Sequence, residues 1–310
     1  MTYKEWLSEW LELYVKPLKH RTYERYKDIC NLHIIGQLGD YELDELKPLV
    51  LQRHINELMV HGNRKNSGVL SANYVNAIIT VIQSSLKRAN ELGYASAYYA
   101  GAIQRPRAEE SVVKCFSVKE QKAIEKAVLE APKRKMLGIV IALYTGVRIG
   151  ELLSLTCSAV DMQKRTITIK TTCYESKDEN GKYAKLTDTT KSHRTRVIPF
   201  PKQLLPIFKE LKALSKSGYV IENGKGEQMS VRSYQRSFEL LIDKLGVSKL
   251  SFHALRHTFA TRALESGMDV KTLSEVLGHK SATVTLNRYA HSMMEHKQSV
   301  MDRFGTLLTK

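Results

Sequence analysis

The sequence has no long hydrophobic run, and this absence excludes a membrane-spanning chain. Its longest apolar stretch, Leu137–Tyr144, is far shorter than the roughly 20 residues that a helix needs to cross a bilayer. The N-terminus carries acidic residues and lacks a basic start followed by an apolar core, so we expect no signal peptide. These absences predict a cytoplasmic protein without a membrane partner.

Cysteine is scarce as well. The four cysteines are Cys30, Cys115, Cys157 and Cys173. They are scattered with no close pair, which favours reduced thiols over a disulfide framework or a zinc site. His253 and His257 have the i, i+4 spacing of a zinc motif, but Ala254 stands where the general-base Glu would be. No third ligand is evident, so we expect neither a metal nor another cofactor.

What the sequence does have is positive charge. The 310 residues carry a net charge of +16, which indicates a polyanionic partner, most simply nucleic acid. A merely basic soluble protein is the alternative. Residues 1–108 hold 14 Lys and Arg against 11 Asp and Glu, and the rest of the chain holds 34 against 21. The excess therefore lies mainly in the C-terminal two-thirds of a chain long enough for two domains.

The first 100 residues have the periodicity of a small helical bundle. Apolar spacing predicts helices over 2–16, from a Thr22 N-cap onward, over 48–61 and over 71–94, which makes about four in all. Basic side chains on the polar faces of two of these helices are candidates for DNA contact. They are Arg21, Arg25, Lys27, Lys87 and Arg88.

Residues 101–111, GAIQRPRAEES, have the composition of an interdomain linker. A second domain over 112–291 then begins with Ser117 and Glu120 in a capping-box pattern. Its helices are predicted in the apolar KRKMLGIVIALYTG and around 201–215, 231–245, 251–266, 269–277 and 281–289. Between them, RTITIKTTCY, YAKLTD and RTRVIPF predict a three-stranded antiparallel sheet. The expected fold class is mainly α, with an N-terminal helical bundle and a mostly helical domain that includes a small sheet.

Five separate segments supply polar residues of the kinds that handle phosphate. In chain order they are Arg148 and Glu151 in TGVRIGEL, Lys191 in TTKSH, His253 and Arg256 in HALRH, His279 in VLGHKS and Tyr289 in LNRYAH. Guanidinium groups bind phosphate oxygens bidentately and stabilise the charge of a transition state. A tyrosine hydroxyl is a nucleophile that can hold a DNA end covalently. The set suits attack on a phosphodiester.

In this order, the set resembles the tyrosine recombinase or phage integrase family. TGVRIGELLSL, HALRHTFAT and LGHKSATVTLNRYAH are similar to its signature segments, and residues 1–100 resemble its core-DNA-binding domain. Lys185 is an alternative to Lys191, but Lys191 lies eight residues before Pro199, as in the family. His257 and His291 are interpreted as lying near the site, where they would be structural or would support a catalytic residue. The resemblance is to members without an N-terminal arm-binding domain.

The resemblance implies how the bond would be cut. Tyr289 would attack the scissile phosphate and form a 3′-phosphotyrosyl link with a free 5′-hydroxyl. Lys191 would protonate the leaving 5′-oxygen, and His253 would assist proton transfer at the tyrosine. A second 5′-hydroxyl would then reseal the DNA, and no ATP would be needed because the enzyme link conserves the ester bond.

The resemblance also assigns the phosphate contacts and the assembly. Arg148 and Arg256 would clamp the phosphate, His279 would donate a hydrogen bond to it, and Glu151 would orient these groups. Strand exchange would require a homo-tetramer on two recombination sites in double-stranded DNA, with possible accessory excision or DNA-bending factors. The apolar stripe in the tail 292–310 is expected to dock on a neighbouring protomer or, alternatively, on its own domain.

The expected function is integration and excision of a mobile element, as in transposition. A recombinase that resolves chromosome or plasmid dimers is the main alternative. A type IB topoisomerase-like enzyme and a catalytically inactive DNA-binding regulator are weaker ones, because the order of motifs favours a recombinase and no predicted catalytic residue is missing.

Overall fold

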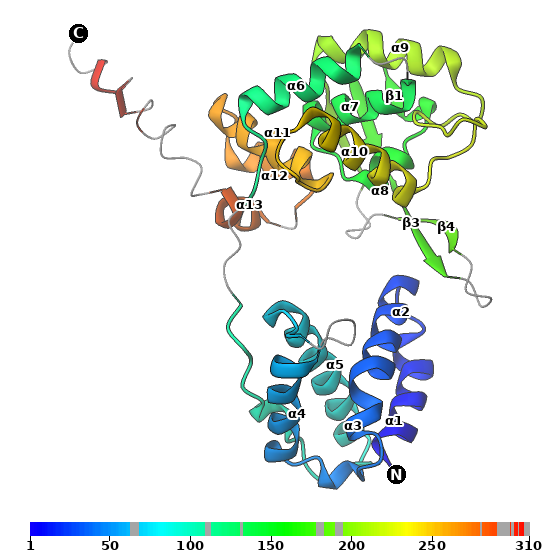
Figure 1. Cartoon of the computed structure of the whole chain (residues 1–310), viewed down its shortest axis with the longest axis vertical. Coiled ribbons are helices and arrows are strands. Elements are labelled where there is room, and N and C mark those ends of the chain that lie inside the picture. Colours follow the sequence, from blue (N-terminus) through cyan, green and yellow to red (C-terminus); the bar gives the residue numbers. More distant parts are fainter. Residues whose placement is uncertain are drawn as a thin grey trace. The chain divides into compact units, whose positions relative to one another are not determined.

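The computed structural model describes residues 1–62, 68–108, 113–130, 133–177, 183–189, 195–279, 281–289, 298, 301–302 and 304–306. It divides into two compact units, Met1–Ser111 and Val112–Lys310 (Figure 1). Within the described residues, no helix has both the length and the apolar character needed to cross a membrane.

The N-terminal unit is a helical bundle built around its longest helix. Helix α1 (Tyr3–Trp10) continues into η1 (Leu11–Val15). Helix α2 (His20–Ile29) continues through η2 (Cys30–Ile34) into α3 (Ile35–Leu38). The last two main helices are α4 (Pro48–His61) and α5 (Ala72–Glu91). The core joins α1 to α5, since Trp6 Nε1 donates to the Ser85 carbonyl at 2.9 Å and the Tyr3 and Ser85 hydroxyls lie 2.7 Å apart.

Two details of this unit differ from what the sequence suggests. The second helix begins at His20 after Lys19, and Thr22 lies inside its first turn, where its backbone N–H donates to the Lys19 carbonyl. The expected N-cap at Thr22 was therefore wrong. The described part of segment 101–111 lies against α4 and α5, because Gln104 N donates to Gln52 and the Pro106 carbonyl accepts from Asn76.

We call the C-terminal unit, Val112–Lys310, the catalytic unit because it contains the predicted catalytic residues. It is mostly helical. Its helices are α6 (Val118–Leu129), α7 (Leu137–Thr145), α8 (Ile149–Leu153), α9 (Leu205–Leu214), α10 (Val231–Leu245), α11 (His253–Glu265), α12 (Val270–Leu277) and α13 (Ala282–Tyr289). The predicted capping box is confirmed: Glu120 N donates to the Ser117 hydroxyl, and Ser117 N donates back to the Glu120 carboxylate. α7 is apolar on every side, and it accordingly lies in the centre of the core, where it packs against α11.

The strands form two small sheets. They are β1 (Val160–Asp161), β2 (Thr166–Ile169), β3 (Thr171–Lys177), β4 (Tyr183–Thr189) and β5 (Arg196–Pro199). The three-stranded antiparallel sheet has the order β1-β2-β5, and β3 pairs only with β4. The fold class is confirmed, but the single strand predicted over RTITIKTTCY is divided at Lys170 and its halves belong to different sheets.

The division at Lys170 follows from how closely β3 approaches α8. A Cβ on Gly150 would lie 2.4 Å from both the Cys173 carbonyl oxygen and the Thr172 hydroxyl oxygen. The Ser154 hydroxyl donates to the Thr171 carbonyl at 2.8 Å. β3 is thus anchored on the helix that carries Glu151, and it pairs with β4 instead of joining the sheet of β2.

Candidate active site

The junction between α7 and α8 positions the first predicted residue. Gly146 ends α7 in the left-handed region, with φ of 65°, and a Cβ there would lie 2.4 Å from the Phe259 ring. Only glycine suits this position, because the turn requires positive φ and α11 lies against it. The chain then turns so that Arg148 becomes the N-cap of α8 in an extended conformation.

A buried carboxylate lies at the centre of the site. Glu151 is 2% exposed and accepts from Arg148 N at 2.9 Å and from Arg148 Nη1 at 2.8 Å. It also accepts from Arg196 on β5, through Nη1 at 2.9 Å and Nη2 at 2.6 Å. Burial raises the pKa of Glu151, but the hydrogen bonds from Arg196 and the charges of both arginines outweigh it and lower that pKa to about 2. Glu151 is therefore ionised, and it orients both arginines.

Arg256, from the second turn of α11, is held by backbone carbonyls. It is 2% exposed, and it donates to the Gly146 carbonyl at 2.8 Å and to the Leu277 carbonyl at 2.7 Å. Burial, followed by repulsion from Arg148 and Arg196, lowers the pKa of Arg256 to about 9, while Glu151 opposes the shift. Arg256 remains charged at neutral pH, and it ties the end of α7 to the end of α12.

The end of α12 presents His279. Gly278 caps the helix in the left-handed region with φ of 65°, and His279 N donates back to the Ser274 carbonyl. The His279 ring turns toward α13, where Nδ1 lies 2.7 Å from the hydroxyl of the buried Thr285. One backbone turn therefore carries the Leu277 carbonyl that Arg256 binds and the predicted phosphate donor.

The predicted nucleophile lies at the end of α13, against α11 and α12. Tyr289 is 2% exposed, and its ring packs in a cluster with Leu273 and Leu277. Its hydroxyl shares a hydrogen bond of 2.7 Å with Nδ1 of His257. The His253 ring is perpendicular to that of His257, with the centroids 4.7 Å apart. His257 thus lies between the Tyr289 hydroxyl and a face of the His253 ring, and the role of His253 in proton transfer stays a prediction.

One predicted catalytic residue lies outside the described part of the chain. Lys191 falls between β4 and β5, in the 190–194 segment. The alternative, Lys185, is on β4, and its ammonium donates to the Gln228 carbonyl at 2.9 Å. Lys191 therefore stays a prediction.

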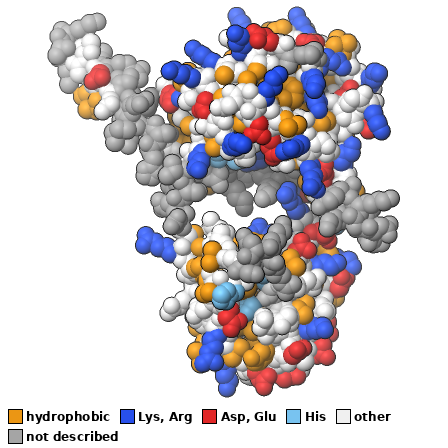
Figure 2. Space-filling view, in the orientation of Figure 1, with side chains coloured by type: hydrophobic (Ala, Val, Ile, Leu, Met, Phe, Trp, Pro, Cys, Tyr) orange, Lys and Arg blue, Asp and Glu red, His pale blue; other side chains and the backbone are white. Residues whose placement is uncertain are grey.

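The basic residues predicted for DNA contact are exposed on two helices of the N-terminal unit. Arg21 and Arg25 are one turn apart on α2, and the Lys27 ammonium lies 5.7 Å from the Tyr23 ring centroid. On α5, Lys87 and Arg88 pair with Glu91 at 4.0 and 2.9 Å, and Arg88 also lies over the Tyr14 ring. Figure 2 shows Lys and Arg spread over the visible face of the catalytic unit, while Asp and Glu gather at the end of the N-terminal unit beside the N-terminus.

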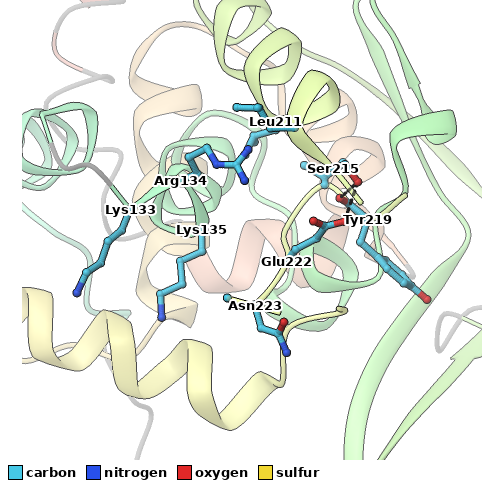
Figure 3. A pocket seen from close by; sticks show the side chains of 11 residues that line it. Lys133, Arg134, Lys135, Leu211, Ser215, Tyr219, Glu222 and Asn223 are labelled. Carbon is cyan, nitrogen blue, oxygen red and sulfur yellow. Dashed lines mark hydrogen bonds between the residues drawn. The ribbon is translucent and has the colours of Figure 1, made fainter. Parts of the chain in front are cut away.

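A pocket of about 320 Å³ in the catalytic unit contains none of the predicted site residues. Figure 3 shows Lys133, Arg134 and Lys135 on one side of it and Glu222 on the other. The Glu222 carboxylate accepts from the Ser215 hydroxyl at 2.8 Å and from neighbouring backbone N–H groups, so this charge is satisfied within its own loop. Elsewhere in the described chain, no group of three or more His, Cys, Asp or Glu could hold a metal.

One residue of the site, Arg196, was missed from the sequence. Arg196 lies 45 residues after Glu151, and a lone arginine at the start of a strand gives no signal of a buried pair. His257 was interpreted as structural or as a supporting residue near the site, and its spacing from His253 places it on the same face of α11. Its contact with Tyr289 depends on the packing of α13 against α11, which local periodicity does not predict.

Comparison with known proteins establishes the family of the chain. The family model described as "Phage integrase family" matches residues 115–296, and that described as "Phage integrase, N-terminal SAM-like domain" matches residues 2–59. The chain belongs to the phage integrase family. The predicted family and the predicted enzyme class, tyrosine recombinase, are thereby confirmed.

Relatives of this chain include proteins named as recombinases and as transposases. A XerC-like tyrosine recombinase of Caldanaerobacter subterraneus is 27% identical over 330 residues, covering 97% of this chain and 81% of the relative. The transposase of transposon Tn916 from Enterococcus faecalis is 29% identical over 183 residues, covering 54% of this chain and 44% of the relative. Both kinds of protein share the family with this integrase.

Solved structures match the integrase over nearly its whole length. The Tn1549 transposon integrase in complex with transposon right end DNA has a TM-score of 0.83 at 20% identity, covering 98% of this chain and 100% of that one. A lambda integrase tetramer bound to a Holliday junction has a TM-score of 0.71 at 19% identity, covering 91% and 79%. At these identities the matches establish the two-domain fold.

Proposed function

We propose that this integrase is a site-specific recombinase that cuts and rejoins double-stranded DNA to integrate and excise a mobile element. The single observation that carries the proposal is the clustering of Arg148, Glu151, Arg256 and His279 around the end of α12, with Tyr289 packed on the same helix. These residues come from four helices, and all of them are of types that bind or attack a phosphodiester or orient the groups that do.

In the first step, the Tyr289 oxygen attacks the scissile phosphorus and the bond to the 5′-oxygen breaks. The tyrosine proton leaves toward His257 and His253, and Lys191 gives a proton to the departing 5′-oxygen. Tyr289 is 2% exposed and its hydroxyl is hydrogen-bonded to His257. Therefore α13 must shift before the Tyr289 oxygen reaches DNA. The product is a 3′-phosphotyrosyl link beside a free 5′-hydroxyl.

The arginines lower the barrier of this step. Arg148 and Arg256 donate to the non-bridging oxygens, where negative charge develops, and His279 adds a further donor. Glu151 keeps the Arg148 fork oriented. In the second step, a 5′-hydroxyl from the other duplex attacks the phosphotyrosine and releases Tyr289, so that exchange proceeds through a Holliday junction without ATP.

The mobile-element role is favoured by the Tn1549 integrase, which matches the whole chain in structure, and by the Tn916 transposase. A dimer-resolving recombinase is the second candidate, since a relative named as a tyrosine recombinase, not as a transposase, aligns with 97% of the chain. Sequencing DNA trapped on Tyr289 in the host distinguishes them. Ends of an excised element support the first role, whereas a single chromosomal or plasmid site supports the second.

We also propose a homo-tetramer on DNA that acts in the cytoplasm, with the tail 292–310 docked on a neighbouring protomer. Met301 and Phe304 in that tail are 63% and 53% exposed and supply apolar surface for such a contact. Deleting residues 293–310 should reduce assembly on paired sites more than binding to a half-site. Equal loss of both would contradict the docking role.

The decisive experiment uses a nicked DNA substrate that traps the covalent intermediate. An adduct that maps to Tyr289, together with exchange between two sites, supports the recombinase. An adduct with relaxation of supercoils but no exchange would indicate a topoisomerase-like enzyme. DNA binding without any adduct would indicate a regulator.

A further inference from the structure

Arg196 joins two parts of the site that are far apart in the sequence. It begins β5, and its side chain is 12% exposed. Nη1 and Nη2 bind both oxygens of Glu151 on α8, while Nε donates to the Val276 carbonyl on α12 at 3.0 Å. One planar group therefore fixes the helix that carries Arg148 against the helix that presents His279.

The turn after α12 is shaped around this side chain. A Cβ on Gly278 would lie 3.0 Å from both Cδ and Nη1 of Arg196. The turn also requires glycine because φ is 65°. Gly278 thus allows the backbone just before His279 to lie on the guanidinium, so the position of His279 depends on Arg196.

Arg196 also divides the charge of Glu151. The carboxylate is shared between Arg196 and Arg148, and Arg196 supplies its bidentate partner. Without Arg196, the whole carboxylate charge would act on Arg148 and draw that guanidinium away from a phosphate. The Val276 carbonyl, at the negative end of α12, would lose its charged donor at the same time.

We infer that Arg196 is a positioning residue for cleavage, which sets Arg148 and His279 at a fixed separation without contacting DNA. The inference rests on the proposed function. Arg196 is not one of the predicted motif residues, and it acts on them through Glu151 and through the end of α12.

The test compares Arg196→Met, Arg196→Lys and Glu151→Gln with the unchanged protein. Covalent cleavage is measured in a single turnover at saturating DNA, and DNA affinity and thermal unfolding are measured separately. Arg236→Met is the matched control, since Arg236 makes an exposed pair with Glu239 in the same unit. Arg196→Met should slow cleavage by about 10²-fold with unchanged DNA affinity, because a small misplacement of catalytic groups costs that much. Arg196→Lys should recover part of the rate, since one ammonium reaches Glu151 or Val276 but not both.

Two further readouts separate positioning from a general loss of structure. If Arg196 acts through Glu151, the double variant Arg196→Met/Glu151→Gln should lose less than the product of the two single losses. A methylphosphonate at the scissile position removes the charge that Arg148 compensates, so the defect of Arg196→Met should shrink on that substrate. Independent losses in the double variant, or a defect of the same size on the neutral substrate, would overturn the inference.

The outcome is distinguishable from failure of the proposed function. If the unchanged protein forms no adduct at Tyr289, the proposed function fails. If that adduct forms and Arg196→Met cleaves at the full rate, only the role of Arg196 fails. Should Arg196→Met not fold, Arg196→Lys carries the same comparison.

Discussion

In the catalytic unit, Arg148 and Arg256 are held by a buried carboxylate and by backbone carbonyls, whereas Arg21 and Arg25 of the N-terminal unit project from an exposed face of α2. A guanidinium held at several points can stabilise charge at one position. An exposed guanidinium is free to follow a phosphate backbone and is screened by salt. Under the proposed function, arginine would serve bond breaking in the catalytic unit and DNA affinity in the N-terminal unit.

The strongest test of this contrast removes the nucleophile. Tyr289→Phe should abolish the covalent adduct because the ring stays in place and only the attacking oxygen is lost. DNA affinity, which we assign to exposed basic residues, should not change. Tyr144→Phe is a suitable control, since that hydroxyl binds Glu125 on α6. An adduct that persists in Tyr289→Phe would place the nucleophile elsewhere.

The next largest effect is expected from Arg148→Lys and Arg256→Lys. A lysine retains the charge but cannot form the planar fork, so cleavage should fall by a factor of about 10² or more. Arg236→Lys on the surface of α10 should leave the rate unchanged. Cleavage by both site variants at the normal rate would mean that these arginines serve the fold alone.

A third test concerns stability and its dependence on pH. Glu151→Gln leaves the positive charges of Arg148 and Arg196 without their carboxylate and should lower the free energy of unfolding by about 3 kcal/mol. Glu239→Gln, which breaks an exposed pair, should change it by less than about 1 kcal/mol. Urea unfolding at neutral pH gives both values.

The sign of the pH effect follows from the folded pKa of Glu151. That pKa is about 2, below the ordinary value of 4.5. The carboxylate therefore contributes stability that is complete above the ordinary pKa and is lost as the pH falls toward 2. The difference between the unchanged protein and Glu151→Gln should shrink over this range, and a constant difference would contradict an ionised Glu151.

The smallest effects are expected in the N-terminal unit. Arg21→Gln and Arg25→Gln should each weaken binding to all DNA sequences alike and reduce the salt slope by about 1 per lost phosphate contact. Cleavage at saturating DNA should not change. Arg53→Gln, exposed on α4, is the charge-matched control. If it weakens binding equally, α2 is not the DNA-contacting face.

Much of this molecule could be predicted from local pattern. The capping box at Ser117 and the bend at Gly146 depend on residues only a few positions apart, and such signals are preserved in the fold. The motifs and their order along the chain were sufficient to predict the family. The strand division at Lys170 was not predictable, because it depends on how closely α8 approaches β3.

The contacts that complete the site are also long-range. Nothing near Arg196 indicates a carboxylate on α8, since their pairing requires β5, α8 and α12 to be packed first. Likewise, the Tyr289–His257 hydrogen bond spans 32 positions. Sequence pattern predicts candidate reactive groups, but the groups that hold them depend on tertiary packing.

Glu151 also limits the affinity of the site for any anion, because it reduces the net positive charge there. Arg148 and Arg196 bind this carboxylate, and Arg256 lies near enough to feel its charge, so that three guanidinium groups against one carboxylate leave two positive charges in excess. A DNA phosphate carries a single negative charge, and more develops as the tyrosine oxygen approaches. A site with this modest excess favours the transition state over the intact strand. Under the proposed function, rejoined DNA would be released more readily than from three unopposed arginines, so the same carboxylate that orders the site would favour turnover.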